Sequence, residues 1–169
     1  MPSATIPARL PVVIQGGMGV AVSDWRLARA VSTAGELGVV SGTALDAVMA
    51  RRLESGDPDG NMRRALAAFP VPAMAERILK RYFIEGGKSE TESYSPAPKL
   101  GMNPTPAQSE LAIVANFAEV WLAKEGHDGL VGINFLEKVQ MATPAAAYGA
   151  LLAGVDFVLM GAGIPAEIP

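Results

Sequence analysis

A glycine cluster near the start of the chain has the residue types and spacing to hold a flat or anionic ligand. Gly16, Gly17 and Gly19 follow the apolar run of residues 12–14, and Ser23 comes shortly after them. Glycine permits positive φ and a close approach of the backbone, and serine is a favourable N-cap for a helix. The order of strand, glycine loop and helix start predicts a ligand loop at this position. A tight strand-to-helix turn that binds nothing fits the local sequence equally well.

Two later stretches carry similar signals. Asn134 is the one polar residue in the apolar run of residues 130–136, and its buried amide needs hydrogen-bond partners from a ligand edge or from a neighbouring backbone. A second glycine loop, with Gly161 and Gly163, follows the apolar run of residues 155–160. Parallel α/β proteins build their sites at the carboxyl ends of their strands, so we expect both glycine loops to face one site.

Two common nucleotide motifs find little support in the chain. The dinucleotide pattern from Gly17 requires a small residue where Val22 stands, and the loop from Gly161 satisfies the pattern only weakly, because it contains Pro165. A phosphate loop at Lys88 would need a glycine where Tyr82 stands. The sequence therefore gives no convincing phosphate cradle.

The composition narrows the function classes. The chain has 169 residues, with 14 Lys and Arg against 17 Asp and Glu, and it has no cysteine. The slight acidity and scattered charge argue against nucleic-acid and membrane partners, and the lack of cysteine excludes disulfides and thiolate metal sites. No metal site is predicted, and the absence of a signal peptide or a membrane span favours the cytoplasm. His127, the only histidine, follows a predicted helix, where a cationic or hydrogen-bonding role is favoured over catalysis.

The hydrophobic periodicity predicts an α/β protein. The expected strands are residues 12–14, 37–42, 130–136 and 155–160, and the expected helices are residues 23–34, 44–54, 61–69, 72–84, about 105–122 and 143–153. The inward helix faces are expected to carry Leu27, Ala30, Val31 and Ala34; Leu111, Val114, Ala115, Ala118, Trp121 and Leu122; and Tyr148, Leu151 and Leu152. Residues 88–106 are polar and rich in proline, which is typical of an exposed loop. This loop could be a lid over a site or a surface excursion without function.

Four strand–helix units in this order predict the first half of a (β/α)8 TIM-type barrel. We expect one domain over residues 1–169, with a helical and loop insertion over about residues 44–126, after the second strand. A whole barrel needs about 200 residues or more, so the sequence predicts a partial chain.

Three segments also resemble a known family. They are Val-Ile-Gln-Gly-Gly-Met-Gly-Val at residues 13–20, Val-Gly-Ile-Asn-Phe-Leu-Glu-Lys at residues 131–138, and Gly-Val-Asp-Phe-Val-Leu-Met-Gly-Ala-Gly-Ile-Pro at residues 154–165. The chain resembles the nitronate monooxygenases, formerly called 2-nitropropane dioxygenases. The resemblance extends to related flavin barrels such as the enoyl-acyl carrier protein reductases.

The resemblance implies an oxidoreductase with non-covalent FMN, which accepts electrons from a nitronate and is reoxidised by dioxygen. It places the backbone of Gly16, Gly17 and Met18 against the flavin ring, a hydrogen bond from Asn134 to the flavin, and the loop that holds Gly161 and Gly163 along the pocket. It also places the flavin-phosphate loops and the catalytic histidine beyond Pro169, so no catalytic residue is assigned. The alternative is a non-catalytic half-barrel module for binding or assembly, which would pair with itself or with a separate C-terminal half.

Overall fold

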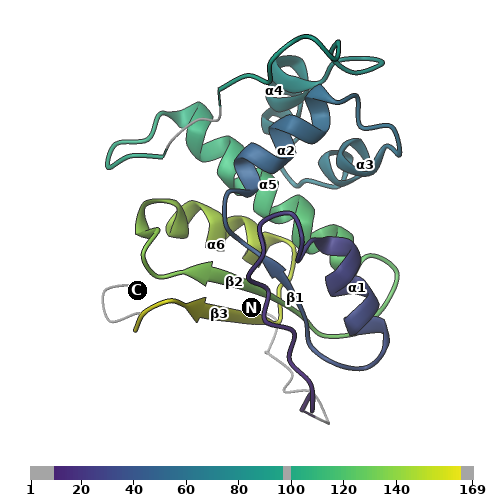
Figure 1. Cartoon of the computed structure of the whole chain (residues 1–169), viewed down its shortest axis with the longest axis vertical. Coiled ribbons are helices and arrows are strands. Elements are labelled where there is room, and N and C mark those ends of the chain that lie inside the picture. Colours follow the sequence, from purple (N-terminus) through teal and green to yellow (C-terminus); the bar gives the residue numbers. More distant parts are fainter. Residues whose placement is uncertain (1–9, 97–99, 165–169) are drawn as a thin grey trace.

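The computed structural model describes residues 10–96 and 100–164. Within these residues the chain forms an open parallel sheet covered on one face by helices (Figure 1). The elements are, in chain order, α1 (Trp25–Thr33), β1 (Gly38–Ser41), α2 (Leu45–Glu54), α3 (Asn61–Ala67), α4 (Pro72–Tyr82), α5 (Pro106–Lys124), β2 (Val131–Leu136), the 3₁₀ turn η1 (Gln140–Ala142), α6 (Thr143–Leu152) and β3 (Phe157–Gly161).

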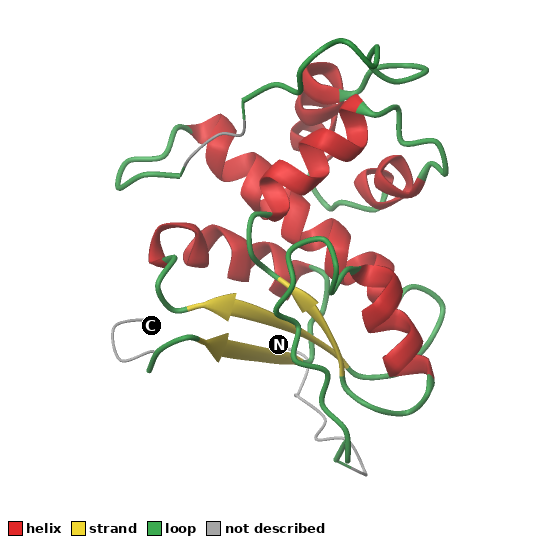
Figure 2. Ribbon diagram, viewed as in Figure 1, coloured by secondary structure: helices red, strands yellow, loops and turns green. Residues whose placement is uncertain are grey.

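The sheet has the strand order β1-β2-β3, and both pairings are parallel. Asn134 of β2 lies level with Ser41 of β1 on one side and with Leu159 of β3 on the other. The crossover from β1 to β2 passes through α2, α3, α4 and α5, whereas α6 alone links β2 to β3 (Figure 2). Three of the four predicted strands and the parallel arrangement are therefore confirmed.

The prediction of a (β/α)8 barrel with four strand–helix units is wrong. The described residues contain three strands in a sheet that does not close. The predicted first strand, residues 12–14, contributes only an isolated parallel bridge between Ile14 and Leu37. The backbone N–H groups of Val12 and Val13 instead donate to a carboxylate oxygen of Glu36, at 2.8 and 2.7 Å. A side chain thus takes the place of a neighbouring strand there.

Burial in this segment also differs from the prediction of a strand covered on both faces. Val12 is 74 % exposed, and Val13 and Ile14 are each 56 % exposed. An unalternating apolar run predicts burial only where a second layer covers it, and the described residues supply no such layer here.

The core lies between the sheet and the helices. Helix α5 runs through the middle of the molecule and contacts α1, α2, α3, α4 and α6. In Figure 1 it separates the sheet layer from the three short helices α2, α3 and α4. Thr105 and Gln108 form a capping box at its start, and Leu111, Val114 and Leu122 are fully buried along it. The predicted inward face of this helix is confirmed, with Trp121 only partly buried.

The inward faces predicted for α1 and α6 are wrong. Ala28 and Ser32 are the buried residues of α1, while Leu27 is exposed. In α6 the small residues Ala146, Gly149 and Ala150 are buried. The three large residues predicted there face outward: Tyr148, Leu151 and Leu152.

Close backbone packing explains why α1 and α6 turn other faces inward than predicted. A Cβ on Gly38 of β1 would overlap the backbone oxygen of Ala28 in α1. A Cβ on Gly149 would likewise overlap the backbone oxygen of Ile113 in α5. Each helix turns its small residues toward a near neighbour, so its larger apolar residues are left at the surface.

Candidate functional site

The predicted site residues gather on the face of the sheet that the helices leave free. Side chains alternate between the two faces of a strand, so Val40 and Ile133 join the core under the helices. Val39, Ser41 and Asn134 therefore point to the opposite face, where the chain segment 15–18 lies over them. We call Gln15, Gly16, Met18, Ser41, Asn134 and Gly161 the sheet-face cluster.

Gln15 attaches this segment to β1. Its backbone N–H donates to the carbonyl of Leu37 at 3.1 Å, and its side-chain Oε1 accepts the N–H of Val39 at 3.1 Å. The backbone then turns away from β1 at Gly16 and Gly17. The side chain of Gln15 therefore makes the next hydrogen bond to β1, which the backbone can no longer make. The Nε2 of Gln15 is buried without a hydrogen-bond partner among the described residues.

Asn134 binds the glycine loop directly. Its Nδ2 donates to the carbonyl of Gly16 at 2.7 Å and lies 3.2 Å from the Sδ of Met18. The prediction that a ligand or a neighbouring backbone satisfies this amide is confirmed for its nitrogen, which uses the backbone. Its Oδ1 is buried and has no partner within the described part of the chain.

Ser41 adds a third unpartnered group on the same face. Its Oγ is buried without a hydrogen bond to any described residue, and the residue is 1 % exposed. Of these three polar atoms, the Nε2 of Gln15 is a hydrogen-bond donor and the Oδ1 of Asn134 is an acceptor. The Oγ of Ser41 can donate or accept. Buried polar atoms without partners are costly, and so many on one face need a physical explanation.

The two glycine loops meet at Met18. A Cβ built on Gly161 would lie 3.3 Å from both the Sδ of Met18 and the Oδ1 of Asn134. Gly163 does not take part in this contact, because a Cβ built on it would meet the carboxylate of Glu137 instead. The structure therefore brings Gly16, Gly17, Met18, Asn134 and Gly161 together and places Gly163 beside them.

Gly17 is needed for the local conformation. Its φ is +64°, and a Cβ there would overlap a methyl group of Val39 and lie 3.2 Å from the Cβ of Asn134. The residue is also buried. Of the two reasons that the sequence offered for a glycine here, positive φ is confirmed, and any larger residue at this position would disturb the fold itself.

The cluster could hold the polar edge of a flat ring. The edge of a flavin ring system presents both carbonyl oxygens and an N–H, which match the donor and acceptor atoms left open by Gln15, Ser41 and Asn134. Met18 is 51 % exposed and covers the Asn134 amide, so its flexible side chain would have to move for a ligand to reach that amide. The cluster thus offers polar atoms of the kinds that a flavin edge uses, all of them buried in this structure, and it includes no cation for a phosphate.

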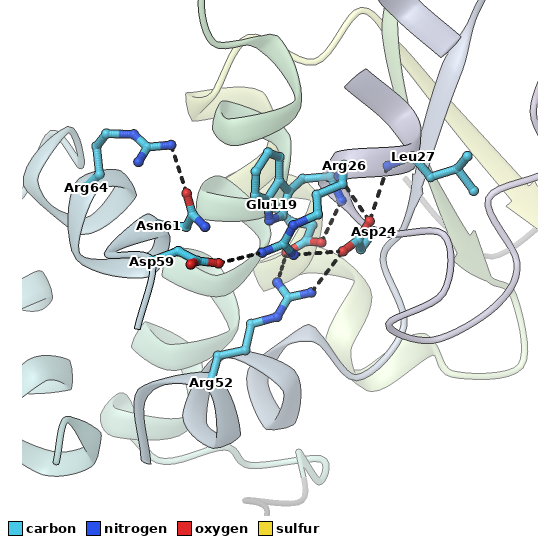
Figure 3. A network of polar contacts seen from close by, with 9 residues as sticks. Asp24, Arg26, Leu27, Arg52, Asp59, Asn61, Arg64 and Glu119 are labelled. Carbon is cyan, nitrogen blue, oxygen red and sulfur yellow. Dashed lines mark hydrogen bonds and ion pairs between the residues drawn. The ribbon is translucent and has the colours of Figure 1, made fainter. Parts of the chain in front are cut away.

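A second polar feature lies at the start of α1 (Figure 3). Glu119 of α5 is 3 % exposed, and its carboxylate accepts the backbone N–H of Trp25 at 2.8 Å and a guanidinium N–H of Arg52 at 2.7 Å. Asp24, the N-cap of α1, pairs with Arg26 at 3.2 Å and with Arg52 at 3.6 Å. Burial raises the pKa of Glu119 above its ordinary value, and the nearby Arg52 partly opposes that rise.

Arg26 and Arg52 of this network line a cavity of about 570 Å³ that α1, α2, the start of α3 and neighbouring loops enclose. Half of its lining residues are apolar or aromatic, and the charged ones are three arginines and two aspartates. The lining residues are Val20, Ala21, Trp25, Arg26, Val48, Arg51, Arg52, Ser55, Asp57, Pro58, Asp59, Asn61, Met62 and Tyr94. The size and lining are typical of a small-molecule site.

Other expected features can be placed as well. The ring of His127 hydrogen-bonds the carbonyl of Ala123 at 2.6 Å and the N–H of Gly129 at 3.1 Å, so it has the expected hydrogen-bonding role at the end of α5. Within residues 10–96 and 100–164, no three His, Asp or Glu side chains come together as metal ligands would. None of the helices in this part of the chain combines the length and apolarity of a membrane span.

Reasoning from sequence missed Ser41 and the ion-pair network as candidate site residues. Ser41 ends an apolar strand in line with Asn134, which is a usable signal once two strands are known to be neighbours. The ion pair between Arg52 and Glu119 joins residues 67 positions apart, and no local sequence pattern predicts it.

Comparison with models of protein families, with curated proteins and with solved structures gave no match to this chain.

Proposed function

We propose that this chain belongs to an FMN-dependent oxidoreductase of the nitronate monooxygenase type and binds the flavin ring at the sheet-face cluster. The observation that carries the proposal is the set of three buried, unpartnered polar atoms on Gln15, Ser41 and Asn134 beside two glycine loops. The resemblance of residues 13–20, 131–138 and 154–165 to that family supports the same assignment. The proposed substrate is a small nitronate, and the proposed location is the cytoplasm, without nucleic-acid or membrane partners.

The protein's own part in this function is to bind and orient the ring. Bound FMN would supply the transfer of electrons from the nitronate to dioxygen. Asn134 would hold the polar edge of the ring through its Oδ1, and the backbone of Gly16 would stay fixed by the Nδ2 of the same residue. No residue is assigned as the catalytic base.

Flavin fluorescence provides the test. The purified chain is titrated into FMN and, separately, into riboflavin, which lacks the phosphate. Because the cluster addresses only the ring, we expect both to bind weakly and with affinities within about threefold of each other, equivalent to less than 1 kcal/mol.

Two asparagine variants test whether Asn134 contacts the ligand or is only a buried amide of the core. Asn134→Leu removes the amide of the cluster. Asn116→Leu is the matched control, because Asn116 is also buried, donates its Nδ2 to a backbone carbonyl and has an unpartnered Oδ1, but lies within α5. We expect Asn134→Leu to lower flavin affinity by about fivefold, equivalent to the roughly 1 kcal/mol of one hydrogen bond, and Asn116→Leu to leave it unchanged. Absence of saturable binding, or equal effects of both variants, would refute the proposal.

A second candidate function is an assembly module. Both outer edges of the sheet carry exposed apolar side chains: Ile14 on one edge, and Val158 of β3, 47 % exposed, on the other. Unpaired edges with apolar side chains favour association. On this reading the chain forms a stable homo-oligomer in light scattering, and Ile14→Lys or Val158→Lys dissociates it. Val71→Lys, at an exposed valine at the start of α4, should not. A monomer at all concentrations would exclude self-assembly.

A further inference from the structure

The cavity beside α1 has a lining that suits a particular kind of ligand. Its apolar walls include Val20, Val48 and Met62, and two aromatic residues, Trp25 and Tyr94, line it as well. The cavity is lined by α1, α2, the start of α3, the loop before α1 and Tyr94, whereas the sheet-face cluster lies over β1 and β2. The two features share only the loop after Gly16, which contacts the sheet at Met18 and lines the cavity at Val20 and Ala21.

Most of the charges around the cavity are already neutralised. Arg26 pairs with Asp24 and Asp59, and Arg52 pairs with Asp24 and Glu119 (Figure 3). The buried carboxylate of Asp57 accepts two backbone N–H groups of α3 and also pairs with Arg63. These pairs hold the walls in place and leave little free charge for a ligand.

Arg51 is the exception. Among residues 10–96 and 100–164 it has no carboxylate within ion-pairing distance, and its guanidinium carbon lies 5.7 Å from the centre of the Tyr94 ring. Tyr94 is itself held by a hydrogen bond of 2.9 Å to the hydroxyl of Ser55. Lys88 lies 4.5 Å from the same ring and donates its Nζ hydrogens to two backbone carbonyls, so two cations flank Tyr94 and neither forms an ion pair with a carboxylate in the described part of the chain.

Trp25 offers a flat apolar surface in the same cavity. Its backbone N–H is fixed by Glu119, and the guanidinium of Arg26 stacks on its ring at 4.5 Å. The stacked pair of the Trp25 ring and the Arg26 guanidinium presents a flat surface for a second ring, and the unpaired guanidinium of Arg51 is suited to a carboxylate or a phosphate.

We propose that this cavity binds a small aromatic anion, with its ring against Trp25 and its carboxylate or phosphate on Arg51. The volume of about 570 Å³ accommodates a ligand of one or two rings. This inference does not depend on the proposed flavin function, because none of the residues in the sheet-face cluster lines the cavity.

Tryptophan fluorescence reports on the proposed site. The chain has two tryptophans, and Trp121→Phe leaves Trp25 as the sole reporter. Phenyl phosphate and benzoate serve as probes, inorganic phosphate presents the anion alone, and phenol presents the ring alone. We expect phenyl phosphate and benzoate to change the fluorescence of Trp25 and to bind at least about tenfold more tightly than either phosphate or phenol. Calorimetry on the wild-type chain checks that Trp121→Phe has not altered binding.

Two arginine variants complete the test. Arg51→Met should weaken the binding of phenyl phosphate about tenfold, as expected for the loss of a charge-assisted hydrogen bond. Arg81→Met is the matched control, because Arg81 is also an exposed arginine stacked on a tyrosine, at 5.4 Å from Tyr82, but lies outside the cavity. It should change the affinity by less than twofold, and so should Asn134→Leu. Binding of phenol as tight as that of phenyl phosphate, equal losses in both arginine variants, or no saturable binding would overturn the proposal.

Discussion

The ion pair between Arg52 and Glu119 should be a sensitive point of the fold. Glu119 is 3 % exposed and Arg52 is 23 % exposed at the side chain, so Arg52→Met leaves a carboxylate in the core with only the N–H of Trp25 as a partner. Removing one partner of a buried ion pair costs about 3–5 kcal/mol. The carboxylate can avoid that cost by binding a proton. From its ordinary pKa of 4.5, protonation at pH 7 costs about 3.4 kcal/mol, at 1.36 kcal/mol per unit. The raised pKa means that the wild-type carboxylate already bears part of this cost, so we expect Arg52→Met to lower the free energy of unfolding by at most about 3 kcal/mol at pH 7.

The pH dependence of this loss identifies its cause. Burial raises the pKa of Glu119, so between its ordinary pKa and the raised value the folded state holds a proton that the unfolded chain has released. Stability therefore falls as the pH rises through this window. For Arg52→Met the cost of protonation shrinks to about 0.7 kcal/mol at pH 5, so most of the loss should disappear there.

Urea denaturation followed by circular dichroism at pH 5, 6 and 7 measures these free energies. Arg77→Met is the control, since its pair with Glu110 is at the surface, where water and salt screen the attraction and an ion pair contributes little. Adding Glu119→Gln to Arg52→Met keeps an acceptor for Trp25 and removes the charge, so it should recover stability at pH 7 and flatten the pH dependence. A loss that is the same at pH 5 and pH 7, or no larger than that of Arg77→Met, would refute this reasoning.

Two glycines give further predictions. Gly17→Ala should destabilise the fold more than Gly86→Ala in urea denaturation. Both glycines have positive φ, which costs a residue with a side chain about 1–2 kcal/mol, but only the methyl group of Gly17→Ala would also press on Val39. Equal losses would show that the loop moves aside. Gly149→Ala should also destabilise, although alanine favours a helix by about 1 kcal/mol, because its Cβ would meet the backbone oxygen of Ile113. A rise in the melting temperature would contradict the close packing of α5 and α6.

Elements that local sequence specifies were predictable here. The helix α5 has a strict apolar period and a threonine–proline start, and both its position and its inward face follow from these features. The strands β1, β2 and β3 follow from short apolar runs bounded by glycine or polar residues. Faces that depend on a neighbour were not predictable. Hydrophobicity alone puts Leu151 inward, but close packing of α6 on α5 needs its small residues there, and this is known only once the two helices are paired.

In the candidate site, too, features set by local sequence were predictable and features that depend on a neighbouring element were not. Glycine loops after strands and an amide within an apolar strand are local signals, and they led to Gly16, Asn134 and Gly161. The family resemblance added Met18, and the four residues lie together in the structure. The fold around them was predicted wrongly, because residues 12–14 look like a buried strand while their N–H groups bond to Glu36. The site does not need that strand. Gln15 fixes the segment to β1 through one backbone bond and one side-chain bond, and Asn134 then fixes Gly16 from β2. A cluster anchored by so few contacts can form on an open sheet, so the failure of the barrel prediction does not remove the physical basis for a ligand at this face.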